Sequence, residues 1–182
     1  MDVDAIHRAS FRKIVEMMSL QIIKHNDILF RDLLRGIAVK NVAWPHPVES
    51  QVKWIIDNMR PDDYHVFLKE NEQDKAYMTL SPVTASVNGV DTPFMGVGCV
   101  CSAHPGMGGG KSIVLGVNEY LKKNNLKGLL FCKSQLIGFY EKYNWNVVTP
   151  EKFILDSSVP GVYAMTYNCQ LVEKLEYKGR LF

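Results

Sequence analysis

The sequence predicts one α/β domain, in which a mixed sheet carries helices on its faces. The first observation is size and composition: 182 residues, 47% apolar and 22% charged, as in one soluble globular domain. The second is that segments with helical and with strand periodicity alternate along the chain. We therefore expect a single domain over residues 1–182, with residues 1–19 as a helical extension at its amino end.

Helical periodicity dominates the first third of the chain. Asn26 and Asp27 are residue types that cap helices, so we expect a helix to begin just after them. Trp44-Pro45-His46-Pro47 ends that helix, because proline cannot continue a helix but suits the start of the next one. The expected elements are a helix over 11–18, a strand over 20–24, a helix over 28–38 and a helix over 47–59.

The rest of the chain changes from strands to an alternation of helices and strands. Asn88-Gly89 is the strongest hairpin signal, because both residues of such a turn need a positive φ angle. A helix should begin in the glycine cluster before Lys111. The expected elements are strands over 64–69, 76–87, 90–103 and 128–132, helices over about 110–125 and 134–140, and strand material over 145–148 and 162–167.

Charge argues against a nucleic acid or membrane partner. The chain has 21 Lys and Arg against 19 Asp and Glu, a net charge of +2 that creates no strong field. The longest uncharged stretch, Thr92 to Gly110, is interrupted by glycines and prolines and cannot form a membrane helix. The first eight residues include Asp2, Asp4 and Arg8 and contain no apolar h-region, so we expect no signal peptide. The spacing of the four cysteines is not that of a small disulfide-bonded scaffold, so we expect free thiols in a cytoplasmic protein.

The informative motif runs from Gly96 to Ser112 and reads as a strand, a glycine-rich loop and a helix. The free N–H groups of such a loop and the positive end of the helix suit phosphate groups. Glycines at 106, 108, 109 and 110 let the backbone approach a ligand, and Lys111 adds a cation. The alternative is a flexible connection that binds nothing.

A nucleotide-binding P-loop is a competing interpretation of Gly110-Lys111-Ser112. A P-loop needs its first glycine where this chain has Pro105. A later strand should also end in a magnesium-binding Asp. The strand 128–132 is instead followed by Lys133.

The same motif, taken with the segments after it, resembles the core of the GNAT acetyltransferase superfamily. The resemblance rests on Val97 to Pro105, the glycine loop, Gly128 to Cys132 and Phe139-Tyr-Glu-Lys-Tyr-Asn-Trp145. It covers residues 92–148 well. It implies a mixed, mostly antiparallel sheet flanked by helices, here with an extra helix at the amino end.

The resemblance also implies a site for acetyl-CoA between two diverging strands. The strand before the loop would offer its backbone to the pantetheine arm, and the loop and helix start would hold the pyrophosphate. Met107 departs from the Arg or Gln of the family pattern, and Ser134 replaces a frequent Asn. The implied cofactor-binding residues are Val100, Cys101, Ser102, Met107, Gly108, Gly109, Gly110, Lys111, Ser112 and Ser134.

Tyr140 matches the tyrosine that in this family protonates the departing CoA thiolate. A phenol with a pKa near 10 within hydrogen-bond reach can protonate a thiolate whose thiol has a pKa of about 8.5. The alternative is an aromatic side chain on the apolar face of a helix, together with Leu136 and Tyr143.

Other candidate residues carry weaker signals. Cys99, Cys101 and His104 lack a second ligand pair with zinc spacing, so we expect no metal. Cys132 has no histidine beside it in sequence that would make it an acyl-enzyme nucleophile. The general base is not identified; the candidates are His46, His65 and His104. Trp44 fits equally a substrate contact and a buried turn residue.

The sequence therefore predicts an acetyl-CoA-dependent N-acetyltransferase that transfers the acetyl group directly to a primary amine of a small molecule or peptide. Two other functions stay open: a module that binds CoA or acyl-CoA without turnover, and a P-loop nucleotide-binding protein. A homodimer is also left open.

Overall fold

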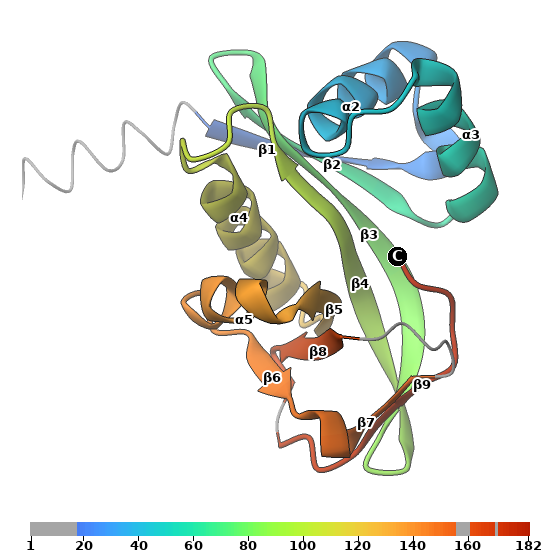
Figure 1. The fold of residues 1–182 in the computed structure, drawn as a ribbon, viewed down its shortest axis with the longest axis vertical. Helices are drawn as coiled ribbons and strands as arrows, with labels where there is room; N and C mark the ends of the chain where they lie inside the picture. The colour runs from blue at the N-terminus through green and yellow to red at the C-terminus, as the bar shows by residue number, and fades with distance from the viewer. Residues whose placement is uncertain (1–17, 156–160, 170) are drawn as a thin grey trace, which may run out of the picture.

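The computed structural model describes residues 18–155, 161–169 and 171–182. Its strands form one sheet in the order β1-β2-β3-β4-β5-β8-β6, and β9 joins the end of β3 and pairs with β7 (Figure 1). The strands are β1 (Met18–Lys24), β2 (Tyr64–Glu70), β3 (Gln73–Val87), β4 (Val90–Ser102), β5 (Gly128–Lys133), β6 (Asn146–Val148), β7 (Phe153–Leu155), β8 (Val162–Tyr167) and β9 (Leu175–Tyr177). The helices are α2 (Phe30–Ala43), α3 (Val48–Asn58), α4 (Gly109–Lys123) and α5 (Ser134–Glu141), with the 3-10 turns η1 (His25–Asp27) and η2 (Pro150–Lys152).

Antiparallel pairing dominates this sheet. Among the described strands, only β4 with β5 and β7 with β9 run parallel. The sequence prediction of a mixed sheet with helices on its faces is confirmed. A P-loop protein, built from repeated parallel strand and helix units, would have a different arrangement.

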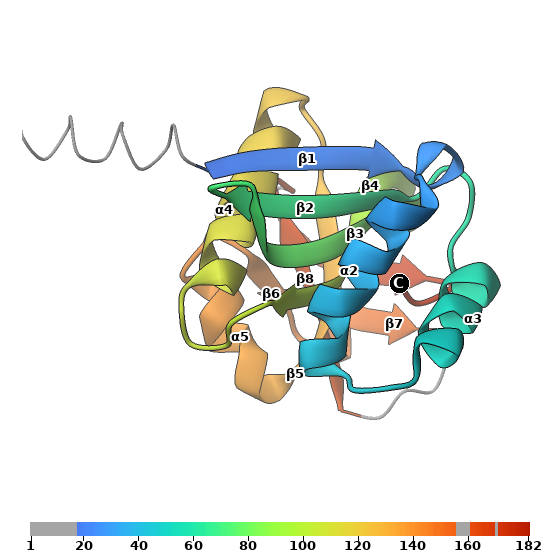
Figure 2. The ribbon, with the colours of Figure 1, turned by 90° about the horizontal axis from the view of Figure 1, so that it is seen from above.

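Helices cover both faces of the sheet, and alternate residues of each strand point to opposite faces. Figure 2 shows α2 lying across β1 to β3 on one side, with α4 on the other. On the α4 side, Val66, Met78 and Val97 join the main apolar core. On the α2 side, Phe67 and Tyr77 pack against Val39 of α2.

An arginine on α2 anchors this helix to the sheet. The Arg35 guanidinium donates hydrogen bonds to two carboxylates. Its Nε and Nη2 groups bind Asp74 of β3 at 2.8 and 2.6 Å, and its Nη1 group binds Asp32 of α2 at 2.7 Å. The guanidinium carbon also lies 4.6 Å from the ring centre of Phe67. These contacts fix the position of α2, which matters because α2 forms one wall of the cavity described below.

The predicted hairpin is confirmed, and its turn has a second role. Asn88 and Gly89 have φ angles of 53° and 83°, as the turn requires. The Asn88 side chain also accepts hydrogen bonds from the backbone N–H groups of Glu173 and Lys174, each at 2.9 Å. Asn88 thereby holds the residues just before β9 against the hairpin end of β3.

The expected helix cap at Asn26 and Asp27 is wrong. Both residues belong to the turn η1, and α2 begins three residues later with Leu29 at its N-cap position and no side-chain cap. The backbone N–H of Asn26 instead binds the carbonyl of Pro61, and that of His25 binds Asp63. Tertiary pairing with the loop before β2 has overridden the local capping preference.

Two further differences, and one expectation that lies outside the described residues, concern the terminal segments. The helix expected over 11–18 lies almost entirely outside the described residues, and so does the extension up to residue 17. Met18 and Ser19, the last residues of that extension, belong instead to strand β1, which pairs with β2. The short strands β7 and β9 were not expected from the sequence.

Candidate functional site

The two central strands β4 and β5 separate along their length. They pair only through Met95, Gly96 and Val97 of β4, although β4 continues to Ser102 and β5 to Lys133. Beyond Val97, β4 keeps its pairing with β3 but pairs with no described strand on its other edge (Figure 1). The result is a V-shaped gap in the middle of the sheet, open toward the carboxyl ends of both strands.

The backbone of β4 presents unpaired groups to this gap. The N–H of Ala103 binds the carbonyl of Lys75 on β3 at 2.9 Å. Because successive residues of a strand turn their backbone groups to opposite edges, Cys101 also faces β3 and Val100 and Ser102 face the gap. Of the three β4 residues implied by the sequence, Val100 and Ser102 are therefore the ones whose N–H and C=O groups a ligand can reach.

A β-bulge at Cys99 lies where the gap opens. Thr79 of β3 pairs with Gly98, but Tyr77 pairs with Cys101, so β4 contains one extra residue. Cys99 has a φ angle of 51°, which is costly for a residue with a side chain. The side chain of Cys99 lies on the face of the sheet that α2 covers, against the cluster that contains Val39 and Phe67. Sequence reasoning missed it, because a bulge depends on the register with a partner strand.

The glycine-rich loop at the end of β4 leads directly into α4. Gly106 and Gly108 have φ angles of 81° and 80°, which only glycine adopts without strain. At Gly109 a Cβ atom would lie 2.8 Å from the carbonyl oxygen of Lys75 and would also meet Ser102 Oγ. Glycine at 109 therefore allows the first turn of α4 to pack directly on β3 and β4.

The first turn of α4 offers donors to a ligand. The N–H of Ser112 binds the carbonyl of Gly108 at 3.0 Å, so the helix itself leaves the N–H groups of Gly109, Gly110 and Lys111 without a helical partner. The helix begins with no side-chain cap and no acidic residue in this turn. These donors, together with the helix dipole, suit an anion such as a pyrophosphate.

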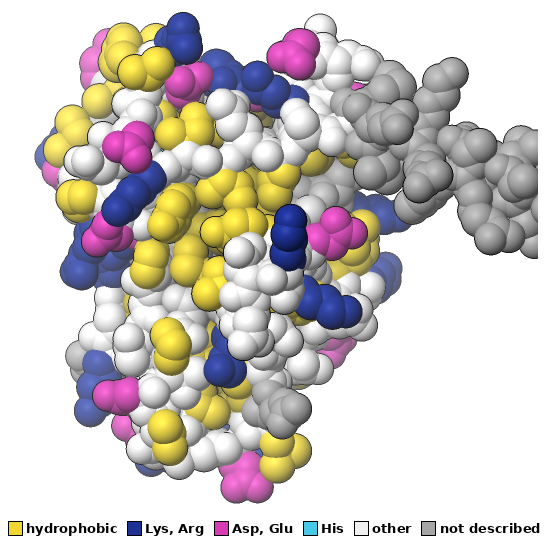
Figure 3. Space-filling model, turned by 180° about the vertical axis from the view of Figure 1, so that it is seen from behind, with side chains coloured by type: hydrophobic (Ala, Val, Ile, Leu, Met, Phe, Trp, Pro, Cys, Tyr) yellow, Lys and Arg dark blue, Asp and Glu magenta, His cyan; other side chains and the backbone are white. Residues whose placement is uncertain are grey.

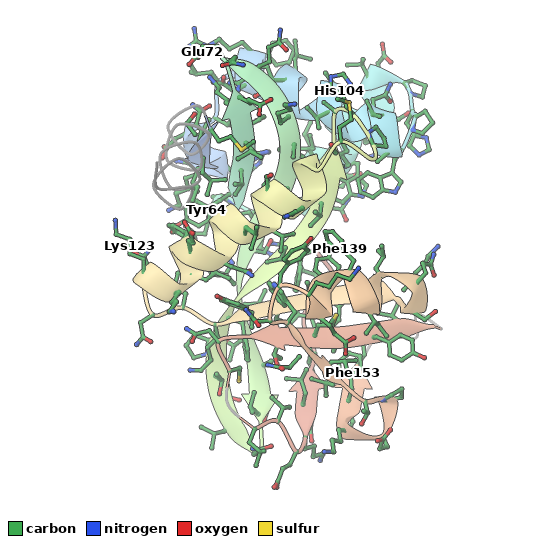
Figure 4. All side chains as sticks on the ribbon, turned by 90° about the vertical axis from the view of Figure 1, so that its left-hand side faces the viewer. Tyr64, Glu72, His104, Lys123, Phe139 and Phe153 are labelled. Carbon is green, nitrogen blue, oxygen red and sulfur yellow. The ribbon has the colours of Figure 1, made fainter. Side chains whose placement is uncertain are left out.

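The structure brings most of the predicted cofactor-binding residues together at this turn. Met107 is exposed, Lys111 is exposed and Ser112 is half-buried on the same stretch. Ser134 is exposed at the first position of α5, on the other side of the gap. Phe139 of α5 comes within 3.9 Å of the position a Cβ would take at Gly110, so the two helices border the same space (Figure 4).

Tyr140 lies on the inner face of α5. Its side chain is buried among the main core residues, with its ring 6.2 Å from that of Trp145. Burial, and then the charge of Cys132, raise the pKa of Tyr140. Among the described residues its hydroxyl has no hydrogen-bond partner. The phenol is therefore protonated at neutral pH and free to donate.

A cavity of about 550 Å³ opens on the other face of the sheet, between α2, α3 and β4. Cys99 of the bulge lines this cavity, so the cavity lies next to the narrow end of the gap, where β4 leaves β5. Gln51, buried on α3, donates a hydrogen bond to the carbonyl of Trp44 at 2.8 Å and fixes the connection between the two helices. The lining residues are Lys40, Trp44, His46, Ser50, Gln51, Trp54, Cys99 and Phe182.

The three histidines considered as general base lie in different surroundings. His46 lines the cavity and is exposed. His65 is buried in a chain of hydrogen bonds, with Nε2 2.9 Å from His25 and Nδ1 2.7 Å from the Tyr77 hydroxyl. His104 is exposed on the loop after β4 (Figure 4). Trp44 and His46, singled out from the sequence, thus lie together at one cavity.

The described residues also allow three other possibilities to be examined: a metal site, a membrane-spanning helix and a thiolate nucleophile. No three His, Cys, Asp or Glu side chains gather closely enough there to hold a metal ion. None of the helices in the described part of the chain could cross a membrane. Burial raises the pKa of Cys132 to about 11, which disfavours a thiolate nucleophile at neutral pH. On the face seen in Figure 3, acidic and basic side chains are interspersed around a band of apolar ones.

No protein-family model and no curated protein sequence matches this chain. Solved structures do resemble it. YhbS from Escherichia coli, a GNAT family N-acetyltransferase in complex with CoA, matches with a TM-score of 0.60 and 12% identity over 89% of this chain and 90% of that one. ElaA from Escherichia coli matches with a TM-score of 0.59 and 16% identity over 83% of this chain and 99% of that one.

A third match shows that the fold also occurs as part of longer proteins. A probable N-acyltransferase from Enterococcus faecalis matches with a TM-score of 0.54 and 19% identity over 71% of this chain. This chain spans only 33% of the length of that protein. The likenesses show that the chain has the GNAT fold, as its sequence predicted.

Proposed function

We propose that the protein is an acetyl-CoA-dependent N-acetyltransferase that transfers the acetyl group directly to a primary amine. One observation carries the proposal: β4 leaves β5 at Val97, and α4 begins at the end of its free edge. This arrangement offers backbone groups along the gap and unpaired N–H groups at its mouth, which suits a long substrate with a pyrophosphate at one end.

The residues present fit acetyl-CoA. The pyrophosphate would bind the N–H groups of Gly109, Gly110 and Lys111, with the Lys111 ammonium nearby. The pantetheine arm would bind the β4 edge at Val100 and Ser102. YhbS, which shares the fold, was crystallised with CoA. The absence of a side-chain donor at Met107 means that the backbone supplies the contacts at this turn.

The chemistry would take place where the gap meets the cavity, at the bulge. An amine in the cavity would attack the thioester carbonyl, and the Val100 N–H, which faces the gap, would stabilise the oxyanion. Tyr140 would then protonate the departing thiolate. His46, which lines the cavity, is the histidine best placed to accept the amine proton, directly or through water.

Release of free thiol from acetyl-CoA in the presence of a panel of primary amines tests this function. We expect a rate that requires both the protein and an amine. A protein that binds acetyl-CoA but releases no thiol with any amine would instead be a binding module. A rate that is the same with and without amine would exclude transfer to an amine.

A further inference from the structure

The cavity between α2, α3 and β4 contains one cationic side chain without a counter-ion. Lys40 is 6% exposed, and its ammonium nitrogen lies 3.3 Å from the ring centre of Trp54. No Asp or Glu is among the described residues that line the cavity. Within the described part of the chain, the Lys40 ammonium makes no ion pair and no hydrogen bond, and it lies against the face of the Trp54 ring in a cation–π contact.

The other buried or half-buried cations of the same region show how unusual this is. Arg35 binds two carboxylates, and Arg180 binds the buried carboxylate of Asp63. Removing a charge from water is costly unless a partner of opposite charge replaces the water. Burial accordingly lowers the pKa of Lys40, although the nearby thiols of Cys99 and Cys101 act in the opposite direction. Lys40 therefore has the surroundings of a cation that a ligand completes.

The remaining walls indicate what else such a ligand contains. The rings of Trp44, Trp54 and Phe182 supply flat apolar surface, and the volume of about 550 Å³ is in the range of small-molecule pockets. Cys99 belongs both to the cavity and to the bulge. A molecule between the aromatic rings thus reaches the end of the gap, where the proposed function places the thioester.

We propose that this cavity binds the acceptor through a carboxylate held by Lys40, with an apolar body packed between Trp44, Trp54 and Phe182. The acceptor class is then a primary amine that carries a carboxylate beside an aromatic or large apolar group, as an apolar α-amino acid does. The proposal rests on the proposed function for the identity of the ligand as acceptor. The anion-binding role of Lys40 can be tested without any turnover.

Phenylacetate and phenylacetamide form a matched pair of probes, because they share the ring and differ in charge. We expect isothermal calorimetry on the full chain to show that phenylacetate binds about tenfold or more tightly, as one charge-assisted hydrogen bond allows. In Lys40→Met, which keeps the length and apolar character of the side chain, the two probes should bind equally. Lys53→Met, at an exposed lysine of α3, is the matched control and should keep the preference.

Equal affinity of the two probes for the wild-type protein would overturn the proposal, and so would the absence of saturable phenylacetate binding. A preference that survives in Lys40→Met would overturn it as well. Circular dichroism and stabilisation by CoA, measured on each variant, show whether it is folded. The CoA measurement also separates the two proposals. CoA can stabilise a protein that does not bind phenylacetate, and a protein that CoA does not stabilise can still bind phenylacetate.

Turnover then tests the link to the acceptor. We expect thiol release with L-phenylalanine or L-tryptophan to exceed that with the corresponding carboxamide. The amine of the carboxamide is less basic, so at neutral pH more of it is in the reactive neutral form, and amine protonation alone does not favour the carboxylate. A wild-type preference for the carboxamides would contradict the acceptor class.

Discussion

At the scale of single residues, Tyr140 connects the fold to the proposed chemistry. It lies on the inner face of α5 with a protonated phenol that has no partner among the described residues. General acid catalysis contributes about 10²–10⁴-fold, so we expect Tyr140→Phe to lower kcat by roughly 10²-fold or more. The KM for acetyl-CoA should hardly change, because the lost interaction forms only as the thiolate leaves.

Tyr143→Phe is the matched control, since Tyr143 packs on Phe139 one turn further along with a ring distance of 5.2 Å. It should retain the kcat of the wild-type protein. An unchanged kcat in Tyr140→Phe would assign Tyr140 to packing alone, which is the alternative that its helical spacing left open.

His65 predicts a pH-dependent stability. Burial, and then the charge of His25, lower the pKa of His65 to about 4. The unfolded chain, whose histidines have a pKa near 6.5, therefore binds more protons between about pH 6.5 and pH 4. Stability is full above this window and falls as the pH decreases through it, by up to about 1.4 kcal/mol per pH unit for this histidine.

Urea unfolding at pH 7.0, 6.0 and 5.0 measures this slope. His65→Asn should have a shallower loss of stability toward low pH than the wild-type protein. His104→Asn, at an exposed loop position, should keep the wild-type slope. Equal slopes for all three proteins would show that folding does not lower the pKa of His65.

Lys40 and Cys99 show what the sequence could not reveal about single residues. A lysine within a helix is ordinarily a solvated residue, and only the tertiary packing of α2 against α3 buries Lys40. Cys99 reads as a small apolar strand residue, and its positive φ angle arises from its register with β3. Val100, Ser102 and the loop glycines were accessible from sequence, because the strand, loop and helix that place them are contiguous.

At the scale of elements, two glycines should respond oppositely to alanine. In Gly109→Ala the added Cβ would lie 2.8 Å from the Lys75 carbonyl, which belongs to β3 and cannot move aside. We expect a loss of about 1–3 kcal/mol, as for other overpacked sites. Gly138 of α5 has nothing within 4 Å of a Cβ, so Gly138→Ala should add up to about 1 kcal/mol through helix propensity.

Urea unfolding of both variants checks this pair. Gly109→Ala should also weaken CoA binding, because the first turn of α4 would move away from β4. A Gly109→Ala protein as stable as the wild type would mean that α4 does not pack on β3 as described.

The elements predicted from the sequence are those whose signals are local. Asn88-Gly89 sets its own turn, and the glycines before Lys111 set the start of α4. The strands β7 and β9 were missed because each has three residues and forms only through pairing with a distant segment. Asn26 and Asp27 were assigned to a cap because the competing bonds come from the loop before β2.

At the scale of the whole molecule, element order was enough to predict the fold class, since helices first, a hairpin in the middle and an alternating end leave few arrangements. The position of the acceptor cavity was not predictable. It is enclosed by α2, α3, β4 and Phe182, which lie far apart in the sequence and meet only in the folded chain.

We propose that the gap between β4 and β5 and the first turn of α4 bind CoA. Thermal unfolding with CoA, acetyl-CoA and Mg-ATP in parallel tests it most directly. A ligand at 100 times its dissociation constant stabilises a protein by about 2.7 kcal/mol, so we expect a clear rise in Tm with CoA and acetyl-CoA and none with Mg-ATP. If neither CoA nor acetyl-CoA raises the Tm, or if only Mg-ATP raises it, the proposed CoA site is contradicted.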